Sequence, residues 1–147
     1  MTNVSETRVR FDSKLGIDEG AVLIDFSMRE LLRAAFLGAG TRCQVADKHL
    51  TIKTAHGNID LPTAKIKLLQ FRHDIFSLHV VATMTDGGTF RGKLVTKRLR
   101  VRYPSSAGLG SGEINCRKLS YIYAHSLDAP ITSTLEDLNQ TLKNRQA

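Results

Sequence analysis

Hydrophobic and polar residues alternate with a period of two along most of the chain between residues 42 and 123. This pattern is typical of β-strands with one buried face, because successive side chains of a strand point to opposite sides of the sheet. Turn-forming residues such as Gly57 and the pair Gly87-Gly88 interrupt the alternation at short intervals. The region is therefore predicted to be a series of short strands, the longest over residues 75–84.

Two segments have the period of an α-helix instead. Residues 27–38 begin with a capping box, Ser27 and Glu30, and continue with apolar residues at helical spacing. Residues 133–145 begin with a second capping box, followed by leucines three and four residues apart. We therefore predict one inserted amphipathic helix and one C-terminal helix.

The alternating pattern occurs twice along the chain. Residues 45–69 and 94–123 share an order of strand, alternating strand, turn and strand, and Lys48 matches Lys97 at an offset of 49 residues. In this alignment Leu61 matches Cys116. One such meander has too little core to be stable alone, so two copies are expected to pack together or to close into one barrel.

The predicted fold class is α+β and β-dominated: a small β-barrel or two packed β-meanders, with the two helices added. A chain of 147 residues with 41% hydrophobic content suits a single domain, 1–147. The candidate repeat units within it are residues 42–69 and 89–123. A glycine-rich loop is predicted over residues 104–111, because Gly and Ser cluster there between two strands.

The positive charge of the chain is concentrated in one segment. The net charge is +7, and residues 91–118 hold eight basic residues and one acidic residue, Glu113, while basic and acidic residues cancel elsewhere. A local positive field attracts phosphates, anionic lipids or an acidic protein. The predicted site for an anionic partner consists of Arg91, Lys93, Lys97, Arg98, Arg100, Arg102, Arg117 and Lys118.

Four of these basic residues lie in the stretch 97–103, KRLRVRY. Its three apolar residues are expected to face the core, whereas Arg100 and Arg102 are expected to face solvent. Arg102 is expected beside Glu113, but the sequence near Arg100 offers no acid. Because unpaired like charges are mildly destabilising, the pattern favours a binding face over an ordinary solvated face.

The sequence carries no motif for catalysis, for metal binding or for a cofactor. The five histidines lack the spacing of metal ligands, and the glycine-rich loop precedes a strand, whereas a phosphate-binding loop precedes a helix. Cys43 and Cys116 are predicted to be buried free thiols in a reducing compartment. No apolar run is long enough to span a bilayer, so a cytoplasmic location is expected.

One short element resembles a known family. Asp25, Ser27 and Glu30 are similar to the Asp/Asn-x-Ser-x-x-Gly element of PilZ receptors for cyclic di-GMP, which join a β-barrel to a terminal helix. Glu30 stands where that family has glycine, and the spacing of Arg8 and Arg10 does not match the family's Arg-x-x-x-Arg motif. The resemblance implies a cyclic-dinucleotide ligand but transfers no residue.

The sequence as a whole favours a non-enzymatic binding or assembly module that engages a polyanion, first of all nucleic acid, through a basic β-face. Few aromatic residues are free for stacking, which counts against recognition of single strands. The alternatives are a scaffold subunit of a larger complex and a peripheral membrane-surface protein, followed by a cyclic-dinucleotide receptor. A homo-oligomer is compatible with each of them.

Overall fold

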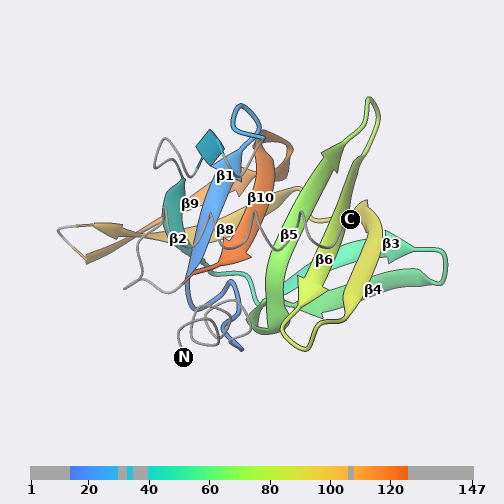
Figure 1. Cartoon of the computed structure of the whole chain (residues 1–147), viewed down its shortest axis with the longest axis horizontal. Coiled ribbons are helices and arrows are strands. Elements are labelled where there is room, and N and C mark those ends of the chain that lie inside the picture. Colours follow the sequence, from blue (N-terminus) through green and yellow to red (C-terminus); the bar gives the residue numbers. More distant parts are fainter. Residues whose placement is uncertain (1–13, 30–32, 35–39, 106–107, 126–147) are drawn as a thin grey trace, which may run out of the picture.

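The computed structural model describes residues 14–29, 33–34, 40–105 and 108–125. The described residues contain ten strands and two short 3-10 turns, η1 and η2 (Figure 1). The elements in chain order are β1 (Ala21–Asp25), β2 (Thr41–Val45), β3 (His49–Thr54), β4 (Gly57–Pro62), η1 (Thr63–Lys65), β5 (Ile66–His73), β6 (Leu78–Met84), β7 (Thr89–Leu94), β8 (Arg98–Ser105), β9 (Gly108–Asn115), η2 (Cys116–Lys118) and β10 (Leu119–Ala124).

All ten strands belong to one curled antiparallel sheet with the order β4-β3-β7-β6-β5-β10-β1-β2-β8-β9. The prediction of a β-dominated fold is therefore confirmed. The sheet is a half-barrel with β4 and β9 as its edges. It is one continuous sheet rather than two separate packed meanders.

A single hydrophobic core joins the two ends of this sheet. Leu50 and Ile52 of β3 and Leu99 and Val101 of β8 are fully buried in the same cluster. Tyr103 is partly buried against it. The alternation in the sequence therefore predicted the inward face of β8 correctly, because an apolar residue at every second position can be buried only if the strand turns that face to the core.

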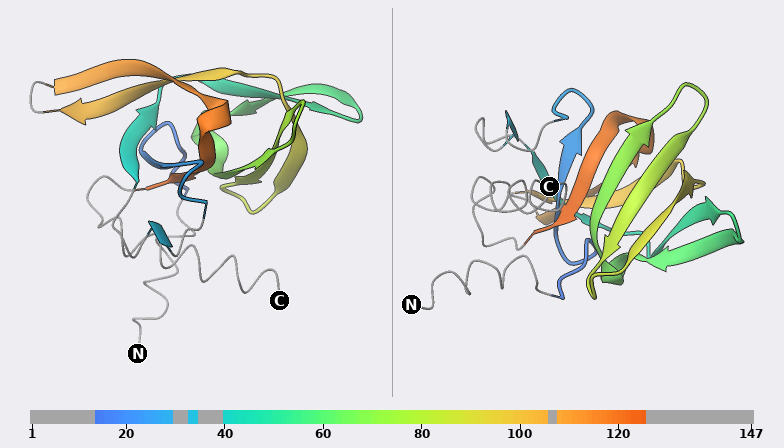
Figure 2. Two further views of the ribbon diagram at one scale, coloured as in Figure 1. Left: turned by 90° about the horizontal axis from the view of Figure 1, so that it is seen from above. Right: turned by 45° about the vertical axis from the view of Figure 1, so that its right-hand side comes forward.

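The two repeated segments adopt the same order of elements. The first runs β3-β4-η1-β5 and the second runs β8-β9-η2-β10, and they occupy mirrored places in the strand order on either side of the β5–β10 pair. Their long hairpins, β3–β4 and β8–β9, extend in opposite directions (Figure 2, left). The arrangement is an approximate two-fold repeat within one chain.

Matching hydrogen bonds support this internal two-fold. The backbone N–H of Ala46 donates to the carbonyl oxygen of Arg100 at 2.7 Å, and the N–H of Val95 donates to that of Thr51 at 3.0 Å. Each residue of the second bond lies 49 positions from its counterpart in the first. The two copies therefore bind one another reciprocally: β2 lies beside β8, and β7 lies beside β3.

The alignment of the second half of the repeat needs correction. The N–H of Thr63 donates to Lys48 O and the N–H of Cys116 donates to Lys97 O, both at 3.0 Å. Cys116 therefore corresponds to Thr63, and the predicted match with Leu61 is wrong. The extra residues of the second copy lengthen the strands: β8 and β9 have eight residues each, β3 and β4 six.

For the same reason the predicted loop over residues 104–111 is mostly strand. β8 continues to Ser105 and β9 begins at Gly108, whose φ of +112° is readily adopted by glycine. The glycines of β9, which the sequence predicts in a loop, pair along β8 instead. Pairing with a neighbour overrides the weak strand propensity of glycine.

The predicted helices do not appear in the described part of the chain. The C-terminal helix, 133–145, lies outside it, and of residues 27–38 only 27–29 and 33–34 are described. Arg33 and Ala34 are helical, but the described residues include no helix with defined bounds. The Ser27 hydroxyl donates to the Asp25 carboxylate at 2.6 Å.

A third correction concerns residues 75–84, which were predicted to be one strand. β6 begins only at Leu78, and the apolar pair Ile75 and Phe76 lies in the turn between β5 and β6. The N–H of Asp74 donates to Ser77 O at 3.0 Å and closes this turn. An apolar run does not by itself show where a hairpin turns.

Candidate anion-binding cavity

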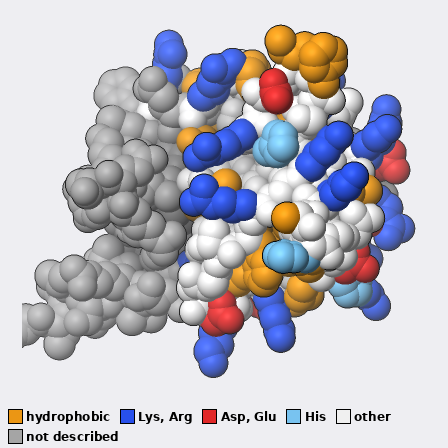
Figure 3. Space-filling model, turned by 90° about the vertical axis from the view of Figure 1, so that its right-hand side faces the viewer, with side chains coloured by type: hydrophobic (Ala, Val, Ile, Leu, Met, Phe, Trp, Pro, Cys, Tyr) orange, Lys and Arg blue, Asp and Glu red, His pale blue; other side chains and the backbone are white. Residues whose placement is uncertain are grey.

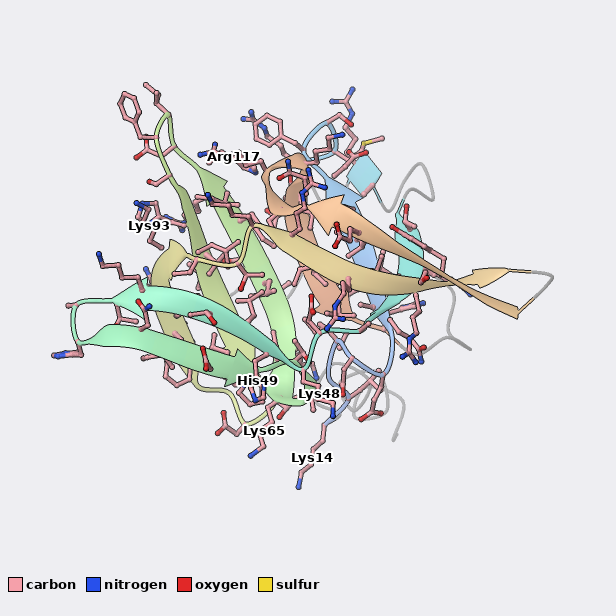
Figure 4. The ribbon with its side chains drawn as sticks, turned by 180° about the vertical axis from the view of Figure 1, so that it is seen from behind. Lys14, Lys48, His49, Lys65, Lys93 and Arg117 are labelled. Atoms are coloured by element: carbon pink, nitrogen blue, oxygen red, sulfur yellow. The ribbon has the colours of Figure 1, made fainter. Side chains whose placement is uncertain are left out.

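Four of the eight predicted basic residues line one cavity of about 540 Å³. Lys93 lies on β7, Lys97 in the β7–β8 connection, Arg98 at the start of β8 and Arg117 in η2. Figure 4 shows Lys93 and Arg117 at the end of the molecule opposite to Lys14, Lys48, His49 and Lys65. Segments far apart in the sequence thus bring four cations together around one space.

The remaining lining of the cavity is neutral. Its polar side chains are Ser77, Thr96 and Asn115, and its apolar side chains are Phe76, Leu78 and Leu94. No carboxylate is among the lining residues that the structure describes. This cavity, lined by Lys93, Lys97, Arg98 and Arg117, is called the basic cavity below.

Hydrogen bonds fix the backbone around the basic cavity. Thr96 Oγ1 accepts from the N–H of Thr51 at 3.0 Å and so ties the β7–β8 connection to β3. Asn115 Oδ1 accepts from the N–H of Arg117 at 2.9 Å and caps η2. The backbone from which the cations project is therefore held by one hydrogen bond between the two copies of the repeat and one within the second copy.

The charges of the basic cavity are hardly compensated. Arg98 Nη1 lies 3.7 Å from Glu113 Oε1, but both side chains are more than half exposed, and such surface pairs contribute little. Lys93, Lys97 and Arg117 form no ion pair with any described residue. The cavity therefore carries a net positive charge even when Glu113 is counted.

A second cavity, of about 450 Å³, occupies the equivalent place in the other copy of the repeat. Its lining residues Gln44, Asp47, Lys48, His49 and Ala64 correspond to Lys93, Thr96, Lys97, Arg98 and Arg117. Unlike the basic cavity, this one is lined by two carboxylates, Asp18 and Asp47, beside Lys48 and Arg102. The two copies of the repeat thus contain equivalent cavities, and of the two only the basic cavity has no acidic residue among its described lining residues.

Arg100 has a partner that the sequence did not predict. Its Nε donates to Asp47 Oδ1 and its backbone N–H donates to Asp47 Oδ2, both at 2.8 Å. Asp47 lies 53 residues earlier in the chain, on the connection that β8 packs against. The expectation that no acid lies near Arg100 is therefore wrong, and Arg100 has a structural role in joining the two copies.

The other predicted residues lie apart from the basic cavity. Arg102 is in register with Ser111 rather than with Glu113, which lies opposite Arg100. Arg102 lines the second cavity, and Lys118 lines a third one, of about 260 Å³, together with Asp25. Arg91 is exposed on β7, two residues from Lys93.

Three basic residues on the neighbouring strands were missed. In the register of the sheet, Lys53 of β3, His79 of β6 and Arg72 of β5 form one row with Lys93. All four are exposed, and Figure 3 shows Lys, Arg and His side chains gathered on this face of the molecule. The alternation places each of them on a polar face, but only the strand order places them side by side.

Other chemistry is sparse in the described residues. Burial raises the pKa of both Cys43 and Cys116 to about 12, and both thiols are free. The described residues contain no group of three or more His, Cys, Asp or Glu positioned to hold a metal ion. Among them there is also no helix long and apolar enough to cross a membrane.

Comparison with protein-family models, with curated proteins and with solved structures found no match to this chain. Function is therefore inferred from the geometry and charge of the basic cavity. Asp25 and Ser27, the residues that resemble the PilZ element, bond to each other and do not line that cavity.

Proposed function

We propose that this protein is a binding module for a phosphate-bearing polyanion, which it holds in the basic cavity. The observation that supports the proposal is the contrast between two equivalent cavities, of which one has carboxylates among its lining and the other has none. Four cations that converge on one space repel each other. A bound phosphate would offset that repulsion, which would explain why four cations line one cavity.

The side chains suit phosphate recognition. Arg98 and Arg117 offer planar guanidinium groups that can donate two parallel hydrogen bonds to one phosphate, and Lys93 and Lys97 add mobile point charges. Asn115 uses its oxygen for the N–H of Arg117, which leaves its amide NH₂ to donate to a ligand. The cavity has no imidazole or carboxylate in its lining to transfer protons, which supports binding rather than catalysis.

Nucleic acid, the partner favoured by the sequence, and anionic lipids present the same phosphate groups to such a cavity. Binding through four cations releases counterions, so the logarithm of the affinity should fall with the logarithm of salt with a slope of about −3 to −4. Heparin is a polyanion without bases or acyl chains. Its binding therefore reports the electrostatic contribution to affinity without contributions specific to nucleic acid or lipid.

The experiment compares the double variant Lys93→Gln/Arg117→Gln with Lys14→Gln/Lys65→Gln by fluorescence anisotropy with labelled heparin and a labelled oligonucleotide over a salt series. Both variants remove two positive charges, but the second pair lies at the opposite end of the molecule (Figure 4). The cavity variant should bind at least tenfold more weakly, with a slope smaller by about 1.5 to 2. Equal losses in both variants, or no binding at low salt, would refute the proposal.

A scaffold role is the second candidate, and one observation favours it. Both edge strands of the described sheet, β4 and β9, lack a neighbour on one side. Open edges can accept a strand from a second chain or from another copy. This alternative expects defined oligomers in light scattering that persist at high salt, whereas the polyanion-binding proposal needs none.

A further inference from the structure

The turn between β5 and β6 carries two adjacent apolar side chains almost entirely in solvent. Ile75 is 81% and Phe76 89% exposed, while Val95, the next most exposed large hydrophobic residue among those described, reaches 43%. Figure 1 shows this turn at the far end of the β5–β6 hairpin, projecting past the neighbouring strands. Exposed apolar pairs of this kind usually mark a contact with a partner.

The turn is held in a defined shape. Besides the closing bond from Asp74 to Ser77, the Asp74 carboxylate accepts from the N–H of Ile75 at 2.7 Å. The Asp74 carboxylate thus stabilises the turn through this hydrogen bond. Ile75 and Phe76 are therefore presented at the tip by a fixed backbone rather than by a disordered loop.

Positive side chains lie near this apolar tip. Phe76 itself belongs to the lining of the basic cavity, with Lys93, Arg98 and Arg117. On the sheet below the turn, Arg72 and His79 lie opposite each other on β5 and β6, next to Lys93. The tip thus combines an apolar end with the cations of the basic cavity and Arg72 set back from it, and Asp74 is the acidic residue of the turn.

We propose that the protein docks on an anionic lipid bilayer, with Ile75 and Phe76 inserted among the acyl chains and the basic cavity holding headgroup phosphates. This inference rests on the proposed function, since it names the source of the phosphates. An anionic bilayer is complementary to the tip, because its phosphates lie above an apolar layer. A nucleic acid would use Phe76 for stacking, but it offers no apolar layer for Ile75.

The test measures cosedimentation with vesicles of phosphatidylcholine alone and of phosphatidylcholine with phosphatidylserine. The variant Ile75→Ser removes the side chain of the apolar tip that does not line the basic cavity, and because this side chain is exposed the core stays intact. Ile75→Leu is the matched control, which keeps the apolar character. Phe76→Leu keeps the apolar character but loses the aromatic ring. All proteins are also measured with heparin and with a labelled oligonucleotide.

We expect the wild type to bind the vesicles that contain phosphatidylserine and to bind pure phosphatidylcholine poorly. Ile75→Ser should bind the anionic vesicles about tenfold more weakly with heparin binding unchanged, and Ile75→Leu and Phe76→Leu should bind the vesicles like the wild type. Unchanged vesicle binding by Ile75→Ser overturns the inference. So does a loss of oligonucleotide binding in Phe76→Leu, which would assign the tip to base stacking.

The two proposals fail in different ways. If heparin binding depends on Lys93 and Arg117 but anionic vesicles are not bound, the lipid inference is wrong and the proposed function stands. If neither heparin nor the oligonucleotide is bound at low salt, the proposed function itself is wrong.

Discussion

The internal repeat gives a direct way to convert the basic cavity into its acidic counterpart. Thr96 corresponds to Asp47, and both side chains accept a hydrogen bond from a backbone N–H across the two-fold, Thr96 Oγ1 from Thr51 at 3.0 Å and Asp47 Oδ2 from Arg100 at 2.8 Å. The substitution Thr96→Asp should therefore keep this bond and the fold while adding a carboxylate to the basic cavity.

The size of the effect follows from Coulomb's law. A carboxylate about 6 Å from a bound phosphate charge repels it by about 0.7 kcal/mol at the dielectric constant of water and by about 2.8 kcal/mol at an effective value of 20 near a protein surface. These limits correspond to a loss of affinity of roughly 3- to 100-fold. The salt dependence should also weaken by close to one unit of slope, because one cation is neutralised.

The assay is heparin binding by anisotropy over a salt series, with thermal unfolding measured on the same samples. Ala64→Asp is the matched control, since it makes the same change in net charge in the second cavity, which already has two acids. The control should change the affinity by no more than about twofold, because its charge lies outside the basic cavity. The reasoning is refuted if Thr96→Asp binds as tightly as the wild type, or if Ala64→Asp loses as much.

Three further predictions concern the stability of the fold and the reactivity of the buried thiols. Asp47→Asn removes the negative charge that accepts two hydrogen bonds from Arg100 and should lower the free energy of unfolding in urea by about 1 to 2 kcal/mol. Glu113→Gln, which changes an exposed ion pair, should lower it by less than about 0.5 kcal/mol. Equal losses in the two variants would contradict the structural role of Arg100. Cys43 and Cys116, with pKa values raised from 9.0 to about 12, should not react with iodoacetamide at pH 8 until the chain is unfolded. Since the unfolded thiols ionise near pH 9 and the folded ones do not, their contribution to stability is complete below pH 9 and is lost as the pH rises toward 12. Rapid labelling of the native protein, or constant stability across this pH range, would show that the thiols are not buried.

Strand identity was largely predictable because the signal is local. The alternation of HLTIKT gave β3 at its observed bounds, and it gave the buried face of β8, where Leu99 and Val101 are fully buried. The excess of positive charge in residues 91–118 was also visible, since charge can be counted without knowing the fold. The prediction of a loop over residues 104–111 was wrong, because pairing with β8 outweighs the weak strand propensity of the glycines in β9.

The sequence by itself thus determined most of the strands, the inward faces of β3 and β8 and the region of excess charge. Only the tertiary structure decided which cations act together, because strand order brings β7 beside β3 and places Lys93 and Arg117 around one cavity. It also supplied Asp47 to Arg100 from 53 residues away and exposed Ile75 and Phe76 at a turn. The physical reason is that side-chain periodicity is set by the backbone of one strand, whereas charge compensation and exposure depend on neighbours that are remote in the chain.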